Sequence, residues 1–576
     1  MRRPLPRHSP GMARPTYVLG TGLSHNGSAV LLKDGRVCVG IEKERLTRRK
    51  HDGGNDNEAI RYCLEAEGIG LADLALVVQS ANFEVPERGR YKGRRLFADA
   101  DHPPVISISH HLAHAWSVAG TSPFDACAIL VVDGCGSPIE QCTDLAGLTL
   151  PADVTCRAPG LWCEKDSFYR FDGCDVLPLA KDFSPMACGV AGGLGMQTTR
   201  HSIGGFYSAV SHYVFGNLDD VGKLMGLAPY GRAGAVRERA FAVRDGRIFV
   251  EEEWKRGLNR PCSGYAAFRA DFQYYADIAF WAQREVEGAI AALFCERLAR
   301  FPAERVGYAG GVALNAVANA RLLEDSVVSQ LYVEPAAGDN GIALGCAYYG
   351  WLRELGQAKA AHDGSTCFGR VYQAEQVVAA LAGAPGSWTI SEPGAALSEQ
   401  VAGLLAEGKT VGWFQDGSEF GPRALGRRSI LAHPGLPGMG DHINAAIKFR
   451  EDFRPFAPAV LPDQAAEWFE SGRESPYMIL VDRTRLERRE ALVNVTHVDG
   501  TARVQTIDPG WNPAFHRLVE AFHRRTGIPV LLNTSFNRRG MPIVETPAEA
   551  VELFAETALD ALVLQDVLVV KGSAPT

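Results

Sequence analysis

The sequence predicts a multidomain α/β protein whose N-terminal part carries a duplicated core. At 576 residues the chain is much longer than the ~100–200 residues of a typical domain. A meander of apolar runs, TYVLGTG and SAVLLKDGRVCVGIE, opens at residue 16, and a similar run that also leads to Asp-Gly, DACAILVVDGCG, opens at residue 125. Strands and helices alternate again beyond residue 365, which predicts a second α/β domain.

The elements of the first unit follow from local signals. Residues 1–16 are rich in Pro and Arg without periodicity, and we expect a disordered leader there. The pair Asp34-Gly35 between two apolar runs predicts a hairpin. NEAIRYCLEAEG, at 57–68, has helical spacing and a terminal glycine, and ALVVQS, at 75–80, is typical of a buried strand.

The second unit continues the pattern. Residues 137–163 are irregular and predict an insertion, whereas 162–180 predict further meander strands. A long helical block at 274–301 precedes the strand RVGYAGG and the helix VALNAVANARLLE. Periodicity fades near residue 365, where we place the domain boundary. The C-terminal part has the strands TVGWFQ, PVLLNTSF and ALVLQDVLVV and helices such as PAEAVELFAET.

Composition narrows the classes of partner. A net charge of −8 argues against nucleic acid as the main partner, although KERLTRRKH at 43–51 is a local basic patch. No stretch reaches the ~18 apolar residues of a membrane span, so no membrane partner is expected. The thirteen cysteines form no C-x-x-C pair, which favours reduced thiols and a cytoplasmic location. A homodimer is compatible with the sequence.

The stretch HHLAHA, at 110–115, contains a candidate metal site. His110 and His114 stand at i and i+4 on one helix face, and His111 faces elsewhere. Asp133, at the end of a strand, and Asp339, before a helix, could complete a group suited to Fe(II), Mn(II) or Zn(II). The alternative is a set of polar helix residues that contact water. A zinc protease of the H-E-x-x-H type is excluded because His111 occupies the position of the glutamate.

Two further patterns indicate anionic ligands. Glycine-rich turns such as LGTGLSHNGSA, GVAGGLGMQ, HSIGGFYS, VGKLMGLAPYG and AGGVALN match no standard nucleotide motif singly, but together they suit a nucleotide bound between two lobes. The C-terminal part concentrates cations among Gly, Pro, Phe and Ala, which favours a polyanionic small molecule over a solvated basic surface. These cations are Arg423, Arg427, Arg428, Lys448, Arg450, Arg454 and Arg503.

The same stretches carry a resemblance to a known family. SHNGSA, EKERLTRRKHDGG, HHLAHA, GKLMGLAPYG, GGVALN, GPRALGRRSIL, FREDFRPFAPAV, ARVQT and NTSFNRRGMPIVETP resemble, in order, the signature blocks of the NodU/CmcH-type O-carbamoyltransferases. The resemblance runs from about Tyr17 to about Lys571. Its last three blocks are the most specific.

The resemblance implies a fold and a reaction. Residues 17–364 would form a duplicated actin-like (ASKHA), TsaD-like domain that transfers a carbamoyl group to a hydroxyl. Residues 365–576 would form a YrdC-like α/β domain that makes carbamoyl adenylate from carbamoyl phosphate and Mg-ATP. It also implies His110, His114, Asp133 and Asp339 as metal ligands, commonly for iron, with a small hydroxyl-bearing natural product or sugar as acceptor.

The chemistry assigns roles to further residues. Condensing two polyanions requires cations, for which we select Arg423, Arg428, Lys448, Arg454 and Arg503. His25 is a candidate base for the transfer step, and its alternative is a satisfied turn histidine. The expected substrate- and nucleotide-binding residues are Lys50, Gly205, Lys223, Gly310, Gly311, Asn315, Asn533, Ser535 and Asn537.

Some features depart from the family pattern, and two rival functions stay open. NLDDVGKLMG replaces a glycine-containing lead into GKLMG, and the insertion at 137–163 is a natural place for acceptor recognition. One rival is a tRNA threonylcarbamoyl-type modification enzyme, which net acidity disfavours. The other is a non-catalytic nucleotide-binding scaffold, which would have no use for the cation cluster.

Overall fold

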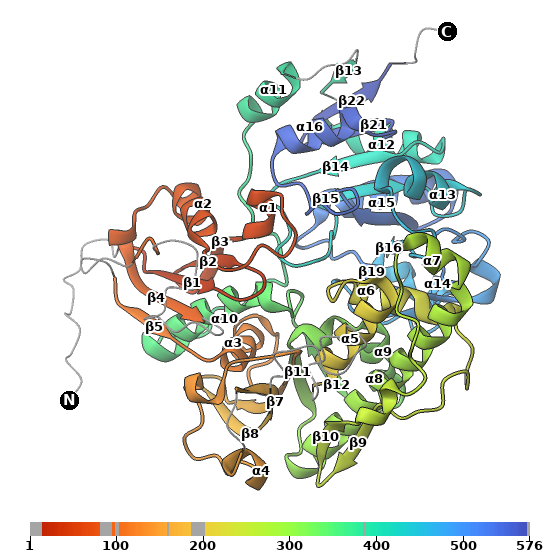
Figure 1. The fold of residues 1–576 in the computed structure, drawn as a ribbon. Coiled ribbons are helices and arrows are strands. Elements are labelled where there is room, and N and C mark those ends of the chain that lie inside the picture. Colours follow the sequence, from red (N-terminus) through yellow and green to blue (C-terminus); the bar gives the residue numbers. More distant parts are fainter. Residues whose placement is uncertain are drawn as a thin grey trace.

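The computed structural model describes residues 14–80, 95–97, 103–157, 161–185, 202–383, 388–392 and 394–572. The expected disordered leader lies outside these residues except for 14–16. The glycine-rich turn GVAGGLGMQ lies outside them entirely. Figure 1 shows the C-terminal domain, in cyan and blue, above the yellow and green helices of the N-terminal domain.

The first sheet has five strands and begins with an antiparallel meander. Its order is β3 (Arg36–Glu42), β2 (Ser28–Lys33), β1 (Tyr17–Gly22), β4 (Leu74–Ser80) and β5 (Val105–Ser107). β4 runs parallel to β1, and β5 runs parallel to β4. The predicted hairpin at Asp34-Gly35 is confirmed, because both residues have positive φ, 50° and 80°, as a two-residue turn between twisted strands requires. The helices α1 (Lys43–Thr47) and α2 (Asn57–Glu67) follow the meander.

The second sheet repeats this order. It consists of β8 (Val176–Pro185), β7 (Trp162–Phe171), β6 (Cys127–Val132), β11 (Arg305–Ala309) and β12 (Gln330–Val333). β6, β7 and β8 form the antiparallel meander, and β11 and β12 add parallel strands on the side of β6. Two sheets with the same strand order confirm the expected duplication of an actin-like core.

Two helices join the sheets. α3 (His110–Thr121) and α10 (Ile342–Tyr348) share one buried core with residues of both sheets, such as Val18 and Ile129. α10 continues into a π-helical turn, Tyr349–Glu354. Their contact is close, because a Cβ on Gly345 of α10 would lie 1.7 Å from the carbonyl oxygen of Ala113 in α3. Only glycine permits this approach, and α3 is therefore held rigidly between the sheets.

The remaining N-terminal helices cover the other face of the second sheet. There Leu130 and Phe168 share a core with the helices, of which α8 is the long block predicted at 274–301. The elements are α5 (Ile203–Phe215), α6 (Val221–Leu227), β9 (Phe241–Arg244), β10 (Arg247–Val250), α7 (Tyr265–Ala270), α8 (Phe272–Arg300) and α9 (Ala316–Glu324). The predicted insertion at 137–163 contains the short α4 (Ala152–Thr155).

The C-terminal domain is built on one mixed sheet of eight strands. Their order is β13 (Trp388–Ser391), β22 (Val567–Lys571), β21 (Ala561–Leu564), β14 (Val411–Phe414), β15 (Arg428–Ala432), β20 (Val530–Ser535), β16 (Ala457–Val460) and β19 (Gln505–Thr506). β17 (Asp482–Arg483) and β18 (Thr501–Ala502) form a separate pair. The architecture agrees with the expected α/β class.

Helices cover both faces of this sheet. Successive side chains alternate, so that Trp413 packs under α12 (Leu397–Ala406) and α15 (Pro513–Thr526), and Phe414 packs on the opposite side. That opposite side is covered by α11 (Ala374–Ala382), α13 (Met439–Ile443), α14 (Ala465–Trp468) and α16 (Pro547–Glu556). The proposed domain boundary at 364/365 falls in the connection between the π-helical turn and α11.

Among the described residues, no helix combines the length and apolarity that crossing a membrane requires.

The α3–α10 contact yields a test of the fold. We expect Gly345→Ala to lower the free energy of unfolding by about 1–3 kcal/mol, because a methyl group has no room beside Ala113. Gly288→Ala in α8 is the matched control, since its Cβ would meet nothing within 4 Å and alanine favours helix by roughly 0.5–1 kcal/mol. The melting temperatures of both variants, compared with that of the wild type, test this expectation. An unchanged melting temperature for Gly345→Ala would contradict the close contact.

Candidate functional site

One cavity of about 1840 Å³ lies between the two domains. The N-terminal domain contributes the turn after β1, parts of α1, α5, α6, α8 and α9, and the end of the loop before α10. The C-terminal domain contributes the loop at 421–424, the segment around Lys448–Phe456 and the turn after β20. The two predicted kinds of site therefore face a common space.

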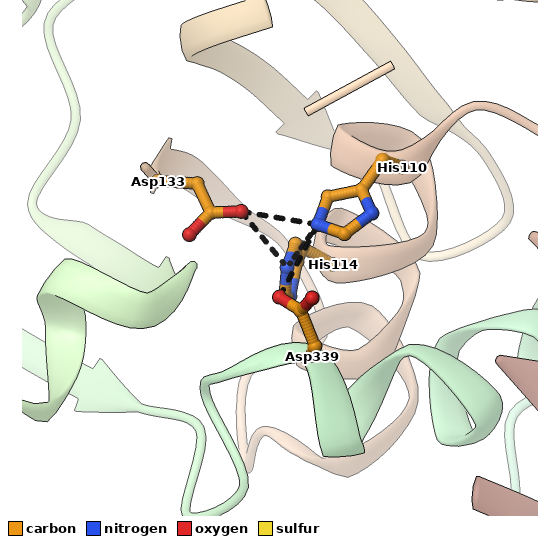
Figure 2. Close-up of side chains that lie close together, drawn as sticks. All are labelled: His110, His114, Asp133 and Asp339. Carbon is orange, nitrogen blue, oxygen red and sulfur yellow. Dashed lines mark hydrogen bonds and ion pairs between the residues drawn. The ribbon is translucent and has the colours of Figure 1, made fainter. Parts of the chain in front are cut away.

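The four predicted metal ligands converge in one group (Figure 2), of which Asp133 and Asp339 line the N-terminal side of this cavity. The Nε2 atom of His110 lies 3.2 Å from Nε2 of His114, 3.0 Å from Asp133 Oδ2 and 3.5 Å from Asp339 Oδ1. One candidate ligand atom from each residue lies within 4.8 Å of the others. α3 supplies both imidazoles, the end of β6 leads to Asp133, and Asp339 stands just before α10.

The donor set fits a divalent transition metal. Two Nε2 atoms 3.2 Å apart have no room for two N–H hydrogens between them, so at least one of them presents a lone pair to this group. Both imidazoles are fully buried, and their Nδ1 atoms have no hydrogen-bond partner among the described residues. Two imidazoles and two carboxylates suit Fe(II), Mn(II) or Zn(II).

The protonation of this group also suits a metal. Burial raises the pKa of Asp133 and of Asp339, but the neighbouring His110 outweighs it and lowers both, so the carboxylates are ionised. Burial lowers the pKa of His114 to about 4, which keeps its imidazole neutral. Burial also disfavours charge on His110, yet Asp339 and Asp133 raise its pKa. A bound cation would take the place of that proton.

His111 faces away from this group, as expected. Its Nδ1 lies 2.8 Å from Ser167 Oγ, and burial lowers its pKa to about 4. Its backbone N–H donates to Glu164 Oε2 at 3.2 Å, and the same oxygen accepts from the N–H of Ser137 at 2.9 Å. The Ser137 hydroxyl in turn accepts from the N–H of His110 at 2.9 Å. Glu164 therefore holds the first turn of α3.

Sequence reasoning missed this support for α3. Glu164 forms a buried ion pair with Lys181, and Lys181 Nζ also lies 2.9 Å from Asp144 Oδ2. The local signal is a run of charged residues, Glu164–Asp166, in the mostly buried strand β7, together with Lys181 and Asp182 in the partly buried strand β8. A buried charge that is paired is an expected arrangement, but its partner lies on another strand and cannot be read from the sequence.

Eight Arg and Lys residues line the C-terminal side of the cavity. Five of them are the predicted Arg423, Lys448, Arg450, Arg454 and Arg503, and the others are Arg483, Arg538 and Arg539. Burial and then Arg454 lower the pKa of Arg423 to about 10 and that of Arg450 to about 9. Burial, followed by neighbouring cations, also depresses the pKa of Lys448 and of Arg503. The cluster thus stores like-charge repulsion that a polyanion would relieve.

Neutral hydrogen-bonding groups lie beside these cations. Lys448 Nζ donates to Ser535 Oγ at 3.2 Å and to Asn537 Oδ1 at 2.5 Å. The side-chain amide of Asn533 donates to Gln505 Oε1 at 2.8 Å. The buried Nε atoms of Arg423 and Arg503 have no partner among the described residues. The described residues therefore leave part of the hydrogen-bonding capacity of these two guanidinium groups unused.

Arg428 does not belong to this cluster, so its selection as a substrate-contacting cation was wrong. Its guanidinium lies over the ring of Phe414, 3.5 Å from the centroid, and donates to the main-chain oxygens of Gln415 at 2.7 Å and Asp416 at 3.0 Å. It lies outside the lining of the cavity. Arg427 likewise bonds Asp416 and the oxygen of Trp511. Arg427 and Arg428 are adjacent in sequence where β15 begins, yet their side chains lie in different surroundings.

Most of the binding residues predicted in the N-terminal domain line the cavity, but one of them does not. Lys50, Gly205, Lys223, Gly311 and Asn315 line the cavity, whereas Gly310 does not. Gly310 has φ +91°, and a Cβ there would lie 2.2 Å from Val132 O, so it serves the approach of β11 to β6. The N–H of Gly311 donates to Asp133 Oδ1 at 3.1 Å and orients that candidate metal ligand.

Two of the lining residues are committed to structural bonds. Lys223 Nζ lies 2.8 Å from Asp220 Oδ2 and 3.0 Å from Glu451 Oε1, so it joins the domains. The Asn315 side chain caps α9 by accepting from the N–H of Ala318 at 3.1 Å.

His25 lies in the turn after β1 and lines the same cavity as the metal group. Its Nε2 is 3.3 Å from Asp219 Oδ1, and its side chain is 51% exposed. This contact with Asp219 raises the pKa of His25. Asp219 belongs to NLDDVGKLMG, the stretch that departs from the family pattern, and sequence reasoning did not assign it a role.

Comparison with known proteins gives the family. Residues 18–92 and 87–348 match the family model described as "Carbamoyltransferase N-terminus", and residues 402–571 match "Carbamoyltransferase C-terminus". The chain belongs to the carbamoyltransferase family. The resemblance drawn from the sequence motifs is therefore confirmed at this level.

Relatives of this carbamoyltransferase share most of its length. Nodulation protein NolNO of Sinorhizobium fredii (strain NBRC 101917 / NGR234) is 34% identical over 96% of this chain and 79% of its own. Nodulation protein U of the same strain is 29% identical over 93% of this chain and 96% of its own. Among solved structures, T. kodakarensis HypF has a TM-score of 0.35 and 18% identity, covering 59% of this chain and 48% of that one.

Removal of one imidazole tests the metal group. We expect His114→Ala to weaken Mn(II) binding by at least roughly 10- to 100-fold, because even the loss of a partner behind a ligand has that effect. Equilibrium dialysis followed by elemental analysis measures it. His111→Gln is the control and should keep the wild-type affinity, since His111 faces Ser167. Equal affinities of His114→Ala and wild type would contradict the assignment.

The Asp219 contact predicts a shifted titration of His25. We expect NMR of ¹⁵N-histidine-labelled protein to give His25 a pKa above the ordinary histidine value, and Asp219→Asn to lower it, because the carboxylate stabilises the protonated ring. Salt should reduce the difference, since the pair is partly exposed. A His25 pKa that is the same in both proteins would show that the contact is absent in solution.

Proposed function

We propose that this carbamoyltransferase is an ATP-dependent O-carbamoyltransferase. In this proposal it forms carbamoyl adenylate from carbamoyl phosphate and Mg-ATP and transfers the carbamoyl group to a hydroxyl of a small natural product or sugar. The observation that carries the proposal is a shared cavity, which is lined by Asp133 and Asp339 of the His/Asp group from one domain and by the predicted cations from the other. Activation of an anion needs the cationic side of the cavity, and transfer to a neutral acceptor needs the side with the His/Asp group.

The cation cluster would perform the activation. Water cleaves carbamoyl phosphate to carbamate and phosphate, and a carbamate oxygen then attacks the α-phosphorus of ATP while pyrophosphate leaves. Both reactants are anions, so Arg423, Arg454 and Arg503 would offset their repulsion and stabilise charge on the α-phosphate. The fold already holds these guanidinium groups together against their mutual repulsion, so they would bind such a ligand with little reorganisation.

The N-terminal side would perform the transfer. The acceptor hydroxyl oxygen attacks the carbamoyl carbon, and the bond from that carbon to AMP breaks. A metal held by the His/Asp group would supply Lewis acidity that polarises the carbamoyl group. Because Nε2 of His25 faces Asp219, Nδ1 of His25 would take the hydroxyl proton.

The alternatives are less well supported. A tRNA-modifying enzyme would need a positive surface for the phosphate backbone, whereas the chain has a net charge of −8. A non-catalytic scaffold gives no reason to bury the cations of the cavity. We therefore propose small-molecule partners, with neither nucleic acid nor membrane, and with iron as the resident metal.

The proposal is tested without an acceptor. We expect purified protein with ATP, carbamoyl phosphate and Mg(II) to produce pyrophosphate and carbamoyl adenylate, detected by phosphorus NMR and mass spectrometry. Arg503→Met should lower the turnover by about 100-fold or more, because it removes a cation from the reacting phosphate.

Arg525→Met is the matched control. This arginine lies on α15 of the same domain, where it pairs with Glu399 at the surface, and its loss should leave turnover unchanged. Absence of pyrophosphate from the folded, metal-loaded wild type, with or without a panel of alcohols, would refute the proposed activation.

A further inference from the structure

Glu42 and Arg45 form a buried ion pair at the junction of the domains. Glu42 ends β3, and Arg45 stands three residues later in α1. The residues are 4% and 1% exposed, although both belong to a short, highly charged stretch. Neither was assigned a role by sequence reasoning.

The pair holds the loop that carries Arg423. The N–H of Gly421 donates to Glu42 Oε1 at 2.9 Å, and Arg45 Nη2 donates to the carbonyl oxygen of Gly421 at 2.7 Å. Both main-chain groups of one residue are thus bound from the other domain. Gly421 has φ +116°, a conformation that favours glycine, and it stands two residues before Arg423.

The same carboxylate oxygen holds the loop that carries Asp339. The side-chain amide of Asn340 donates to Glu42 Oε1 at 2.9 Å, and the main-chain oxygen of Asn340 accepts from Ser28 Oγ at 2.8 Å. Asn340 follows the metal ligand Asp339 directly. One atom of Glu42 therefore contacts both the segment that presents a metal ligand and the segment that presents a substrate-facing arginine.

We propose that Glu42 and Arg45 are positioning residues that fix the adenylate-forming side of the cavity relative to the transfer side. This inference rests on the proposed function, because it assigns the two sides successive steps of one reaction. Arg45 and Glu42 act through Gly421 and Asn340 and need not touch the substrate.

The energetics favour a positioning role. Burying an ion pair costs desolvation, and replacing both partners by apolar groups of similar size is often neutral or stabilising. The contribution of the ion pair to stability therefore does not explain why it is buried here. Its hydrogen bonds to the two loops do explain it, since a displacement of a substrate-contacting group by about 1 Å can lower the rate roughly 100-fold.

This difference makes the double variant Glu42→Leu/Arg45→Met decisive. We expect it to fold, with a melting temperature below that of the wild type because Gly421 and Asn340 lose hydrogen-bond partners. Its KM for ATP in pyrophosphate formation should rise roughly 10- to 100-fold, and its Mn(II) affinity should fall, because both loops lose their common anchor. Arg45→Lys should raise only the KM, since lysine keeps the charge but lacks the fork that reaches Glu42 and Gly421 together.

Arg48→Met is the control. Arg48 follows α1 and also contacts the other domain, donating to Ile543 O at 3.0 Å, but it touches neither loop. It should leave both measurements unchanged. Wild-type KM and Mn(II) affinity in the folded double variant would overturn the inference.

If the double variant does not fold, Arg45→Lys tests the inference alone. A KM for ATP equal to that of the wild type would then overturn the inference. A wild type that forms no pyrophosphate refutes the proposed function instead, so the two failures are distinguishable.

Discussion

The contact between α3 and α10 is the constraint on which the N-terminal site depends. His110 and His114 point from α3, and Asp339 stands at the turn that starts α10, so the separation of these ligands follows from how closely the two helices approach. Gly345 brings the helix backbones together, and the duplicated sheets enclose the pair on both sides. Asp133 then enters from β6, the first strand of the second repeat. A four-residue donor group is assembled from elements that belong to both repeats.

The C-terminal side of the cavity is governed by repulsion between buried cations rather than by close packing of helices. Its cations are buried and repel one another, as the lowered pKa of Arg423, Arg450 and Lys448 shows. Two like charges 4 Å apart cost about 4 kcal/mol at an effective dielectric constant near 20, so the sheet and its helices must hold them in place. Binding of a polyanion converts that cost into affinity. The proposed order of events, anion first and neutral acceptor second, follows from this electrostatic difference.

Much of this arrangement was predictable because the signals were local. Spacing at i and i+4 placed His110 and His114 on one face, and a strand end and a helix start marked Asp133 and Asp339 as candidates to complete the group. Cation density located Arg423 and Arg503, but it did not separate them from Arg428, because the direction of a side chain at the start of β15 depends on the whole sheet. Glu164 was missed for a related reason. It serves α3 through contacts with residues distant in sequence, and no spacing rule encodes such contacts.

Glu42 illustrates how two sites without a shared element can still be kept in register. A carboxylate oxygen has more than one lone pair, so a single buried atom can accept from Gly421 and from Asn340 at once. Bonds from one rigid atom fix the relative position of two loops more directly than separate bonds to separate atoms would. In the proposed reaction, carbamoyl adenylate would hydrolyse in water, and a route inside one cavity would protect it only while the two ends stay aligned. The protection of the intermediate and the alignment of the sites are therefore the same structural requirement.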